Sequence, residues 1–545
     1  MDGISDFPPG PIASVLPRWI AIVSCVRPTC TRYDEPLAMI KVAHTRTAFL
    51  AVLFLGLFAM AARDATDPDL WWHLATGRFI VQHGEVPHID PFSYTSGGKP
   101  WVAHEWLTDV ALYELQRTGW AGLIIFFAAV ISMAFFLMYL RCGPNAYVAG
   151  VATLIAALAS RPTWGVRPQV LSLLLTSLWL LLLERSERDP KILLWTVPLM
   201  LLWVNLHAGF ALGLVVYGLF LLGQWMESRL DVRQNPAGLP SSTRKSMRLP
   251  ALILALDVLL VPVNPNGVKL YWYPLETLRS SAMQNYIAEW ASPNFHHAEY
   301  LPFLLIVLVL FAMLGWQRAA IRPRDVLLLI VGLFAALRSI RLIPLFVLIA
   351  IPIISRQISK WLRTRPGPEP QRKRLALRVR TILNASIVTA VAAFAGIHTA
   401  QVIRHEPQSE MRQFPEGAVA FLQAHAPAGP IFNNYDWGGY LVWKLYPSLR
   451  VFIDGRADVY GDQFLHDFAT TYEFKDDWQQ TIQRWEIQSV LVPPQSALAT
   501  GLRNAPGWIV SFEDAQAVVL TRSPAPQTNS GNALGRSQSG MLLTN

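Results

Sequence analysis

Long apolar runs recur along this chain of 545 residues and are separated by short polar or basic segments. A helix needs about 20 mostly apolar residues to cross the hydrocarbon core of a bilayer. Only 15% of the residues are charged, against about a quarter in ordinary soluble domains. The sequence therefore predicts a polytopic α-helical membrane bundle.

We expect about eleven spans, several of them shorter than a full crossing and therefore half-buried in the bundle. A polar break at residues 205–209 makes the fifth and sixth either a tight hairpin or one broken helix. The spans cover residues 47–62, 121–140, 146–160, 168–183, 192–206, 208–226, 249–263, 301–317, 326–337, 342–355 and 382–400.

The distribution of charge predicts the orientation of these spans. Basic residues gather in alternate short loops, most densely from Arg356 to Arg380, and such loops face the cytoplasm. The same pattern accounts for the net charge of +9 without nucleic-acid binding. The acidic loop 63–120 then lies outside. The sequence predicts a bacterial-type inner (plasma) membrane protein with a cytoplasmic N-terminus and an extracytoplasmic C-terminal region.

Four regions follow from these patterns. Residues 1–38 are expected to be disordered or an over-extended start, and residues 39–400 to form the transmembrane domain with its outer loop 63–120. Residues 401–522 carry short apolar strands between turn and helix signals, which predicts a small α/β domain. The strands are expected near 430–433, 450–454, 489–492, 508–511 and 517–520. The tail 523–545 is expected to be disordered.

The outer loop opens with Asp67-Pro68-Asp69-Leu70-Trp71-Trp72-His73. Two carboxylates at this spacing can share a divalent cation such as Mg²⁺ or Mn²⁺, or one can act as a general base. The alternative is that Asp67 caps a helix beginning at Pro68. Trp71 and Trp72 suit either the membrane interface or stacking on a sugar ring.

His104 and Glu105 form a second catalytic candidate in the same loop. Their alternative role is a solvent-facing polar pair in a helix from Ala103 to Gln116. The pair is not a zinc-protease motif, because Thr108 stands where the second histidine would be needed. His73 and His104 could also join Asp67 or Asp69 around a metal ion.

Four arginines are predicted on the outer side, against the positive-inside bias: Arg161, Arg167, Arg338 and Arg341. A guanidinium at the edge of a bundle binds phosphate by its planar fork, or it extends to lipid headgroups. The sequence favours a lipid-linked phosphate. His207 is expected to be a buried, satisfied histidine, and His297 to line the site. Asp436, in a turn after a predicted strand, is a further binding candidate.

The order of first span, large acidic outer loop, many spans and outer C-terminal domain resembles the GT-C superfamily of membrane glycosyltransferases. Asp67 and Asp69 match the place of that superfamily's acidic motif near the end of the first helix. The resemblance covers about residues 40–400. It implies a polyprenyl-phosphate sugar as donor and a glycan or lipid as acceptor. Tyr435 to Tyr440 faintly resembles an oligosaccharyltransferase motif, but the residue order differs and one Trp is missing.

Sugar transfer from a polyprenyl-phosphate donor on the outer face is therefore the favoured function. Asp69 or Asp67 would be the base, and the arginines would hold the phosphate. The alternative is a non-enzymatic scaffold or lipid-glycan transporter whose outer domain binds a glycan or partner. A transporter is expected to carry broken helices and polar residues at mid-membrane, and the sequence shows few beyond 205–209 and Asp257. An oligosaccharyltransferase acting on protein is a third option.

Overall fold

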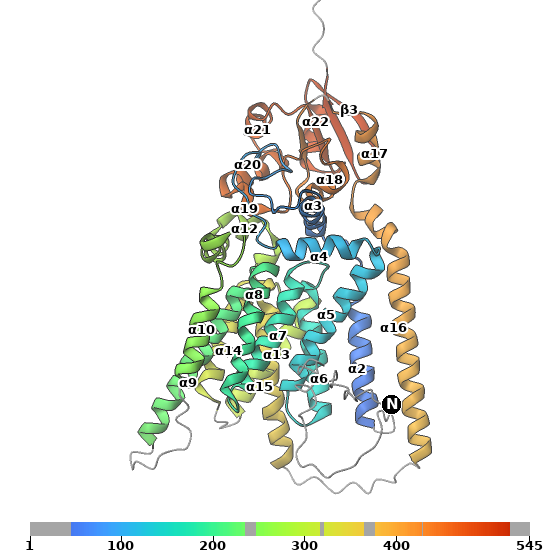
Figure 1. Cartoon of the computed structure of the whole chain (residues 1–545). Coiled ribbons are helices and arrows are strands. Elements are labelled where there is room, and N and C mark those ends of the chain that lie inside the picture. The colour runs from blue at the N-terminus through green and yellow to red at the C-terminus, as the bar shows by residue number, and fades with distance from the viewer. Residues whose placement is uncertain (1–44, 235–246, 317–320, 365–376, 428, 524–545) are drawn as a thin grey trace, which may run out of the picture. The chain divides into compact units, whose positions relative to one another are not determined.

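The computed structural model describes residues 45–234, 247–316, 321–364, 377–427 and 429–523, all within one compact unit (Figure 1). The segment 1–38 and the tail from 524 onward, both expected to be disordered, lie outside the described residues. The expectations for them stay predictions.

Each predicted span coincides with a helix. Five helical segments are long and apolar enough to cross a membrane: Trp120–Arg141, Phe210–Leu230, Ala298–Gly315, Ile340–Arg363 and Leu377–Gln413. The chain is thus a multi-pass membrane protein, as predicted. The helices are α2 (Thr45–Ala61), α5 (Trp120–Arg141), α6 (Ala146–Ser160), α7 (Gln169–Arg185), α8 (Thr196–Leu206), α9 (Phe210–Gln234), α10 (Arg248–Leu259), α13 (Leu301–Trp316), α14 (Pro323–Arg338), α15 (Ile343–Thr364) and α16 (Leu377–Gln413).

The polar break at 205–209 is a tight hairpin between α8 and α9, which resolves the two alternatives. His207 adopts extended backbone after α8, and α9 begins at Phe210. Gly223 of α9 then comes back against Arg324, which pairs with Glu187 before α8. The two helices therefore run in opposite directions.

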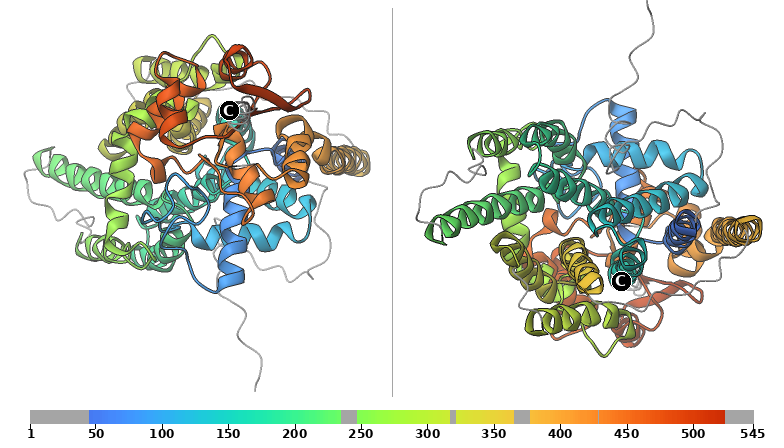
Figure 2. Two further views of the ribbon diagram at one scale, coloured as in Figure 1. Left: turned by 90° about the horizontal axis from the view of Figure 1, so that it is seen from above. Right: turned by 90° about the horizontal axis from the view of Figure 1, so that it is seen from below.

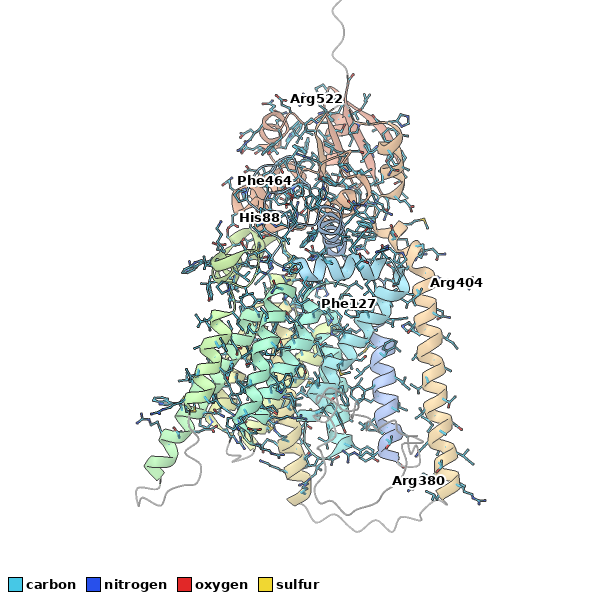
Figure 3. All side chains as sticks on the ribbon, viewed as in Figure 1. His88, Phe127, Arg380, Arg404, Phe464 and Arg522 are labelled. Carbon is cyan, nitrogen blue, oxygen red and sulfur yellow. The ribbon has the colours of Figure 1, made fainter. Side chains whose placement is uncertain are left out.

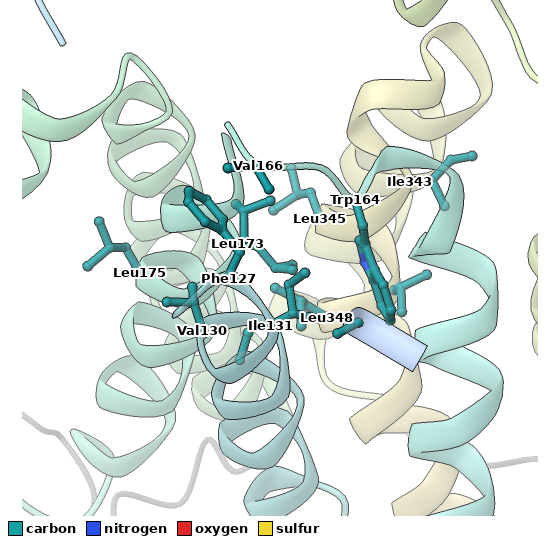
Figure 4. Packing of buried hydrophobic residues seen from close by; sticks show 14 of the residues in the cluster. Phe127, Val130, Ile131, Trp164, Val166, Leu173, Leu175, Ile343, Leu345 and Leu348 are labelled. Carbon is teal, nitrogen blue, oxygen red and sulfur yellow. The ribbon is translucent and has the colours of Figure 1, made fainter. Parts of the chain in front are cut away.

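The bundle is held together by a continuous apolar core. Close packing of Phe127, Ile131, Trp164 and Leu173 joins α5, α7 and the segment between α6 and α7 (Figure 4). The long helix α16 instead lies at the rim, where it packs along α2 and touches α5 (Figure 2). Arg380 and Arg404, which are labelled in Figure 3, both lie on this helix. Most of its surface is free to face lipid, because only 11% of its apolar window is buried.

The outer loop holds two helices, α3 (Pro68–His83) and α4 (Trp106–Gln116), which pack against each other. The first turn of α3 also packs on α18 (Gly438–Leu445). A Cβ atom at Gly439 would lie 3.0 Å from the carbonyl oxygen of Pro68 and 3.1 Å from the nitrogen of Trp72. A glycine at 439 therefore lets α3 and α18 approach closely. Of the two paired glycines, only Gly439 contacts α3.

The outer domain contains a four-stranded sheet in the order β1-β2-β4-β3, with β1 and β2 parallel and the other pairs antiparallel. The strands are β1 (Ile431–Asn433), β2 (Ser489–Val492), β3 (Trp508–Glu513) and β4 (Val518–Arg522). The helices are α17 (Glu416–Ala424), α19 (Ala457–Tyr460), α20 (Asp462–Tyr472), α21 (Trp478–Arg484) and α22 (Ala497–Asn504).

One predicted strand is wrong: residues 450–454 are extended but do not join the sheet. Their polar groups bond elsewhere. The nitrogen of Val451 donates to the carbonyl of Phe92, and the side chain of Asn433 bonds to the backbone of Phe452 and Ile453. The apolar alternation in this segment was read correctly, but its backbone bonds to Phe92 of loop 63–120 and not to a neighbouring strand of the sheet.

A buried ion network ties the loop to the outer domain. Arg456 Nη1 lies 2.8 Å from Asp90 Oδ1, and its Nη2 lies 2.6 Å from Asp454 Oδ2. All three side chains are essentially inaccessible to water. The tyrosine hydroxyl of Tyr94 also donates to the carbonyl of Ile431 at 3.1 Å. Loop 63–120 and the C-terminal region thus share one end of the molecule, as the charge pattern predicted.

Replacing Arg456 with methionine is expected to destabilise the protein by about 3–5 kcal/mol, since two buried carboxylates lose their cation. Thermal unfolding of the reconstituted full chain measures the effect. Arg503→Met is the matched control, because Arg503 pairs with Glu513 at the surface and such pairs contribute little. Equal losses of Tm in the two variants would contradict the buried network.

Candidate active site

The acidic motif lies where α3 begins. Asp67 caps the helix: its Oδ1 accepts a hydrogen bond from the backbone nitrogen of Asp69 at 3.0 Å, and Pro68 follows as the first helical residue. The capping alternative is therefore confirmed. Asp67 also makes a second contact, because its other carboxylate oxygen lies beside a cation.

That cation is Arg167. Its Nε lies 3.1 Å from Asp67 Oδ2, and its terminal nitrogen pairs with Glu289. Burial alone would lower the pKa of Arg167, but the two carboxylates outweigh burial and raise it. Arg167 is thus a permanent, already neutralised cation that anchors Asp67, and it has little capacity left for a phosphate.

Asp69 is the less encumbered carboxylate. Its Oδ1 accepts a hydrogen bond from Trp72 Nε1 at 3.2 Å, and it lies against Gly455 of the outer domain. Burial, aided by the negative charge of Asp67, raises the pKa of Asp69 to about 6. A carboxylate with this pKa is ionised at neutral pH and accepts a proton more readily than an ordinary aspartate.

A cavity of about 650 Å³ opens beside Asp67. Its walls are apolar side chains of α2, α5 and α16, and its other end is polar. The apolar lining includes Met60, Ile124, Phe127, Ile131, Phe394 and Val402, and the polar lining includes Arg63, Asp64, Asp67, Arg161 and His398. Such a cavity suits an amphipathic ligand with an apolar tail between helices and a charged head at the membrane surface.

Two arginines and two aspartates line the polar part of the cavity, and one of the aspartates, Asp67, is already paired with Arg167. Arg63 donates to the backbone carbonyl of Arg161 at 3.0 Å, and Arg161 itself is exposed. Burial together with the nearby Arg161 lowers the pKa of Arg63. An anion placed between these two guanidinium groups would relieve their mutual repulsion.

The remaining predicted binding residues are dispersed around this centre. Arg341 lies over the ring of Trp290 at 5.5 Å and helps to hold down the pKa of Glu289. Exposed Arg338 donates to Gln284 Oε1 at 2.9 Å. His297 is exposed beside η5 (Ala298–Tyr300). Asp436 is exposed in η7 (Tyr435–Trp437), where burial and nearby Asp67 raise its pKa.

The two predicted tryptophans have different surroundings. Trp71 is fully buried and packs edge-to-face on Phe414 and Tyr440, so it joins α3 to the outer domain. Trp72 is half-buried, with its ring against His73. Only Trp72 has surface with which to meet a substrate.

A second polar centre surrounds Glu105. Three imidazole Nε2 atoms lie near its carboxylate, those of His104 at 3.4 Å, His207 at 3.6 Å and His73 at 3.7 Å. His73 is held on its other side by Asp109, with 2.5 Å from Nδ1 to Oδ1. We call these five side chains the Glu105 cluster. The alternative of a solvent-facing His104–Glu105 pair is wrong, because both side chains are largely buried.

The ionisation of the Glu105 cluster follows from its contacts. Although burial opposes it, His207, His104 and His73 together lower the pKa of Glu105 well below its usual range. Burial lowers the pKa of His207 to about 4, whereas neighbouring carboxylates outweigh burial and raise the pKa of both His73 and His104. The cluster thus combines Glu105, whose pKa is lowered, with two histidines whose pKa is raised, one histidine whose pKa is lowered, and Asp109, whose pKa burial raises to about 6.

A divalent cation at Asp67 and Asp69 does not fit these contacts. Both oxygens of Asp67 are engaged, one by a backbone N–H and one by Arg167. Within the described ranges, no group of three or more His, Cys, Asp or Glu side chains is placed to hold a metal ion. No catalytic step is therefore derived through a metal.

Several residues of the site were missed from the sequence. Arg63 directly follows the first span, and an arginine at that position was a readable signal. Glu289 and Asp109 looked like ordinary loop and helix carboxylates, since their partners are distant in sequence. His207 was expected to be a buried, satisfied histidine. It is half-buried, and its Nδ1 bonds to Ser172, but its Nε2 faces Glu105.

No protein-family model matches the chain, and no curated protein matches it. Among solved structures, the chain is similar to ArnT from Cupriavidus metallidurans bound to undecaprenyl phosphate, at 15% identity and a TM-score of 0.45 over 88% of this chain and 98% of that one. It is similar to the archaeal oligosaccharyltransferase AglB from Archaeoglobus fulgidus, solved with an inhibitory peptide and a dolichol-phosphate, at 11% identity and a TM-score of 0.43 over 81% and 69%.

A third similar structure is the arabinofuranosyltransferase AftD from Mycobacteria, at 14% identity and a TM-score of 0.44, covering 88% of this chain but only 40% of AftD. Two of these three structures are named as an oligosaccharyltransferase and an arabinofuranosyltransferase, which is the kind of enzyme that the sequence resembles. At such identities and TM-scores, the activity of this chain is argued from its own residues.

Proposed function

We propose that this chain is a membrane glycosyltransferase that transfers a sugar from a polyprenyl-phosphate donor to an acceptor hydroxyl on the outer face of the membrane. The observation that carries the proposal is the cavity beside Asp67. It joins an apolar wall inside the bundle to Arg63 and Arg161 at the membrane surface. A lipid phosphate has this same division between an apolar chain and an anionic head.

The arginines have separate tasks in this proposal. Arg63 and Arg161 hold the donor phosphate, because both residues line the cavity. Arg167 positions Asp67 at the cavity's edge. Arg341 is not among the residues that line this cavity, and it lies over the ring of Trp290 near Glu289. The exposed Arg338 contributes least.

Asp69 is the general base. It takes the proton from the acceptor hydroxyl while the acceptor oxygen forms a bond to the anomeric carbon of the sugar. The bond from that carbon to the phosphate oxygen breaks, and its electron pair leaves with the lipid phosphate. The fixed charges of Arg63 and Arg161 stabilise the departing anion, which is the larger electrostatic contribution. Holding donor and acceptor in line supplies much of the remainder.

Transfer of a radiolabelled sugar from polyprenyl phosphate in proteoliposomes tests the proposal. The full chain should release labelled product, and a double variant with Asp67→Asn and Asp69→Asn should not, while still giving a cooperative unfolding transition. Full activity in the double variant, or no binding of polyprenyl phosphate by the unmodified protein, would overturn the proposal.

The pH dependence of the reaction has a definite sign. A base works in its deprotonated form, and burial raises the pKa of Asp69 to about 6. We therefore expect kcat to rise with pH through about 6 and to level off above it. Measuring transfer from pH 4.5 to 8 at saturating donor checks this. A flat profile across that range would exclude Asp69 as the base.

A further inference from the structure

The Glu105 cluster has unsatisfied polar atoms that the proposed donor site does not use. Its three N-to-O separations of 3.4 to 3.7 Å are too long for direct hydrogen bonds. His104 is only 8% exposed, and its buried Nε2 atom has no hydrogen-bond partner among the described residues. An unpaired buried donor is costly unless a ligand completes it.

The protonation of His207 determines what kind of ligand can do so. Its Nδ1 accepts a hydrogen bond from the backbone nitrogen of Gly209 at 2.9 Å and lies 2.7 Å from Ser172 Oγ. Neutral His207 must then carry its proton on Nε2, the atom that faces Glu105. His207 is therefore a hydrogen-bond donor and not a metal ligand, which requires a free Nε2 lone pair.

The cluster lies at a junction of several elements. His73 and Asp69 are four residues apart on α3 and so share a helix face. Tyr273, at the start of α11 (Tyr273–Arg279), packs its ring on His104 at 4.1 Å between centroids. Asp458 of α19 is exposed, and the charges of His104 and Glu105 act on it. Bundle, loop and outer domain all contribute.

The charges around this junction select against anions. The carboxylates Asp69, Glu105, Asp109 and Asp458 lie around His73, His104 and the nearby Arg341, whereas Arg456 is already paired with Asp90 and Asp454. No excess positive charge is therefore left for an anion. The half-buried rings of Trp72 and Tyr273 lie against His73 and His104. A neutral ligand with several hydroxyl groups and an apolar face satisfies such a lining, because each hydroxyl both donates and accepts.

We infer that Glu105, His104, His207 and Asp458, with Tyr273, form a binding site for a neutral glycan. It is separate from the cavity beside Asp67, with which it shares no residue. Glu105 and Asp458 accept from sugar hydroxyls, and His104 and His207 donate to them. That this glycan is the acceptor of the transfer rests on the proposed function. His73, whose Nε2 lies 3.7 Å from Glu105, is one helical turn from Asp69 on α3.

Saturation-transfer NMR on the full chain in phosphatidylcholine nanodiscs tests the site. The probes are the methyl glycosides of glucose, mannose and galactose, with glucuronate as the anionic comparison. At least one neutral glycoside should show saturable binding, and glucuronate should bind more weakly. Glu105→Gln and Asp458→Asn should each weaken the neutral ligand about tenfold, since each removes a charge-assisted acceptor.

The controls separate this inference from the proposed function. Glu114→Gln, a change at a surface carboxylate of the same helix α4, should leave glycoside binding unaltered. Asp458→Asn affects an exposed side chain, so it tests the site even if Glu105→Gln fails to fold. Binding of no neutral glycoside, unchanged binding in folded Asp458→Asn, or equal binding of glucuronate overturns the inference. If glycosides bind but polyprenyl phosphate does not, the glycan site stands and the proposed function fails.

Discussion

Asp69→Asn is expected to lower kcat by about 10²- to 10⁴-fold, the usual contribution of a positioned general base. Asparagine keeps the shape of the side chain and can still accept from Trp72 Nε1, so α3 should keep its place. Donor affinity should change little, because Asp69 is not part of the cavity lining. Single-turnover transfer and polyprenyl-phosphate binding, measured on one preparation, distinguish the two effects.

Asp67→Asn is the matched control for that substitution. Asparagine caps helices as well as aspartate does, so the cap on α3 should survive while the ion pair with Arg167 is lost. We expect a smaller fall in kcat than for Asp69→Asn, accompanied by a lower Tm, since Arg167 keeps only Glu289. A larger loss of kcat in Asp67→Asn than in Asp69→Asn would reverse the assignment of the base.

The sequence predicted the membrane architecture well because apolar spans are a strong, local signal. Neighbouring residues likewise indicated the cap at Asp67 and the hairpin at 205–209, each as one of two alternatives, and most of the strands of the C-terminal domain. The segment 450–454 was mistaken for a strand because its hydrogen-bond partners are Asn433 and the loop at Phe92. No local pattern can report a partner so far away along the chain.

The site residues show the same contrast between features set by neighbouring residues and features set by distant partners. Asp67 and Asp69 were proposed from their spacing and position, and Arg161 and Arg167 from their predicted place outside, against the positive-inside bias. The different roles of these two arginines could not be predicted from the sequence, because they depend on Glu289. Glu289 pairs with Arg167, and no ion pair between Glu289 and Arg161 is found among the described residues. The role of His207 similarly depends on Ser172 and Gly209, which fix its tautomer.

The combined substitution of Arg63 and Arg161 by glutamine is expected to weaken polyprenyl-phosphate binding by about ten- to a hundredfold for each arginine. A hydrogen bond to a charged group contributes about 1.5–3 kcal/mol, and every 1.4 kcal/mol is tenfold in affinity. kcat should fall as well, because the departing phosphate loses its stabilising charges. Titration of polyprenyl phosphate into nanodiscs, with transfer measured in parallel, gives both quantities.

Arg338→Gln is the control for this loss, since Arg338 is exposed and bonds to Gln284 instead of facing the cavity. Arg161→Lys refines the result: lysine keeps the charge but not the planar fork, so binding should fall between the unmodified protein and Arg161→Gln. If Arg338→Gln weakens binding as much as the double substitution, the phosphate lies elsewhere, and the cavity beside Asp67 does not hold the donor. Unaltered affinity in the double variant would have the same consequence, because no other pair of cations lines that cavity among the described residues.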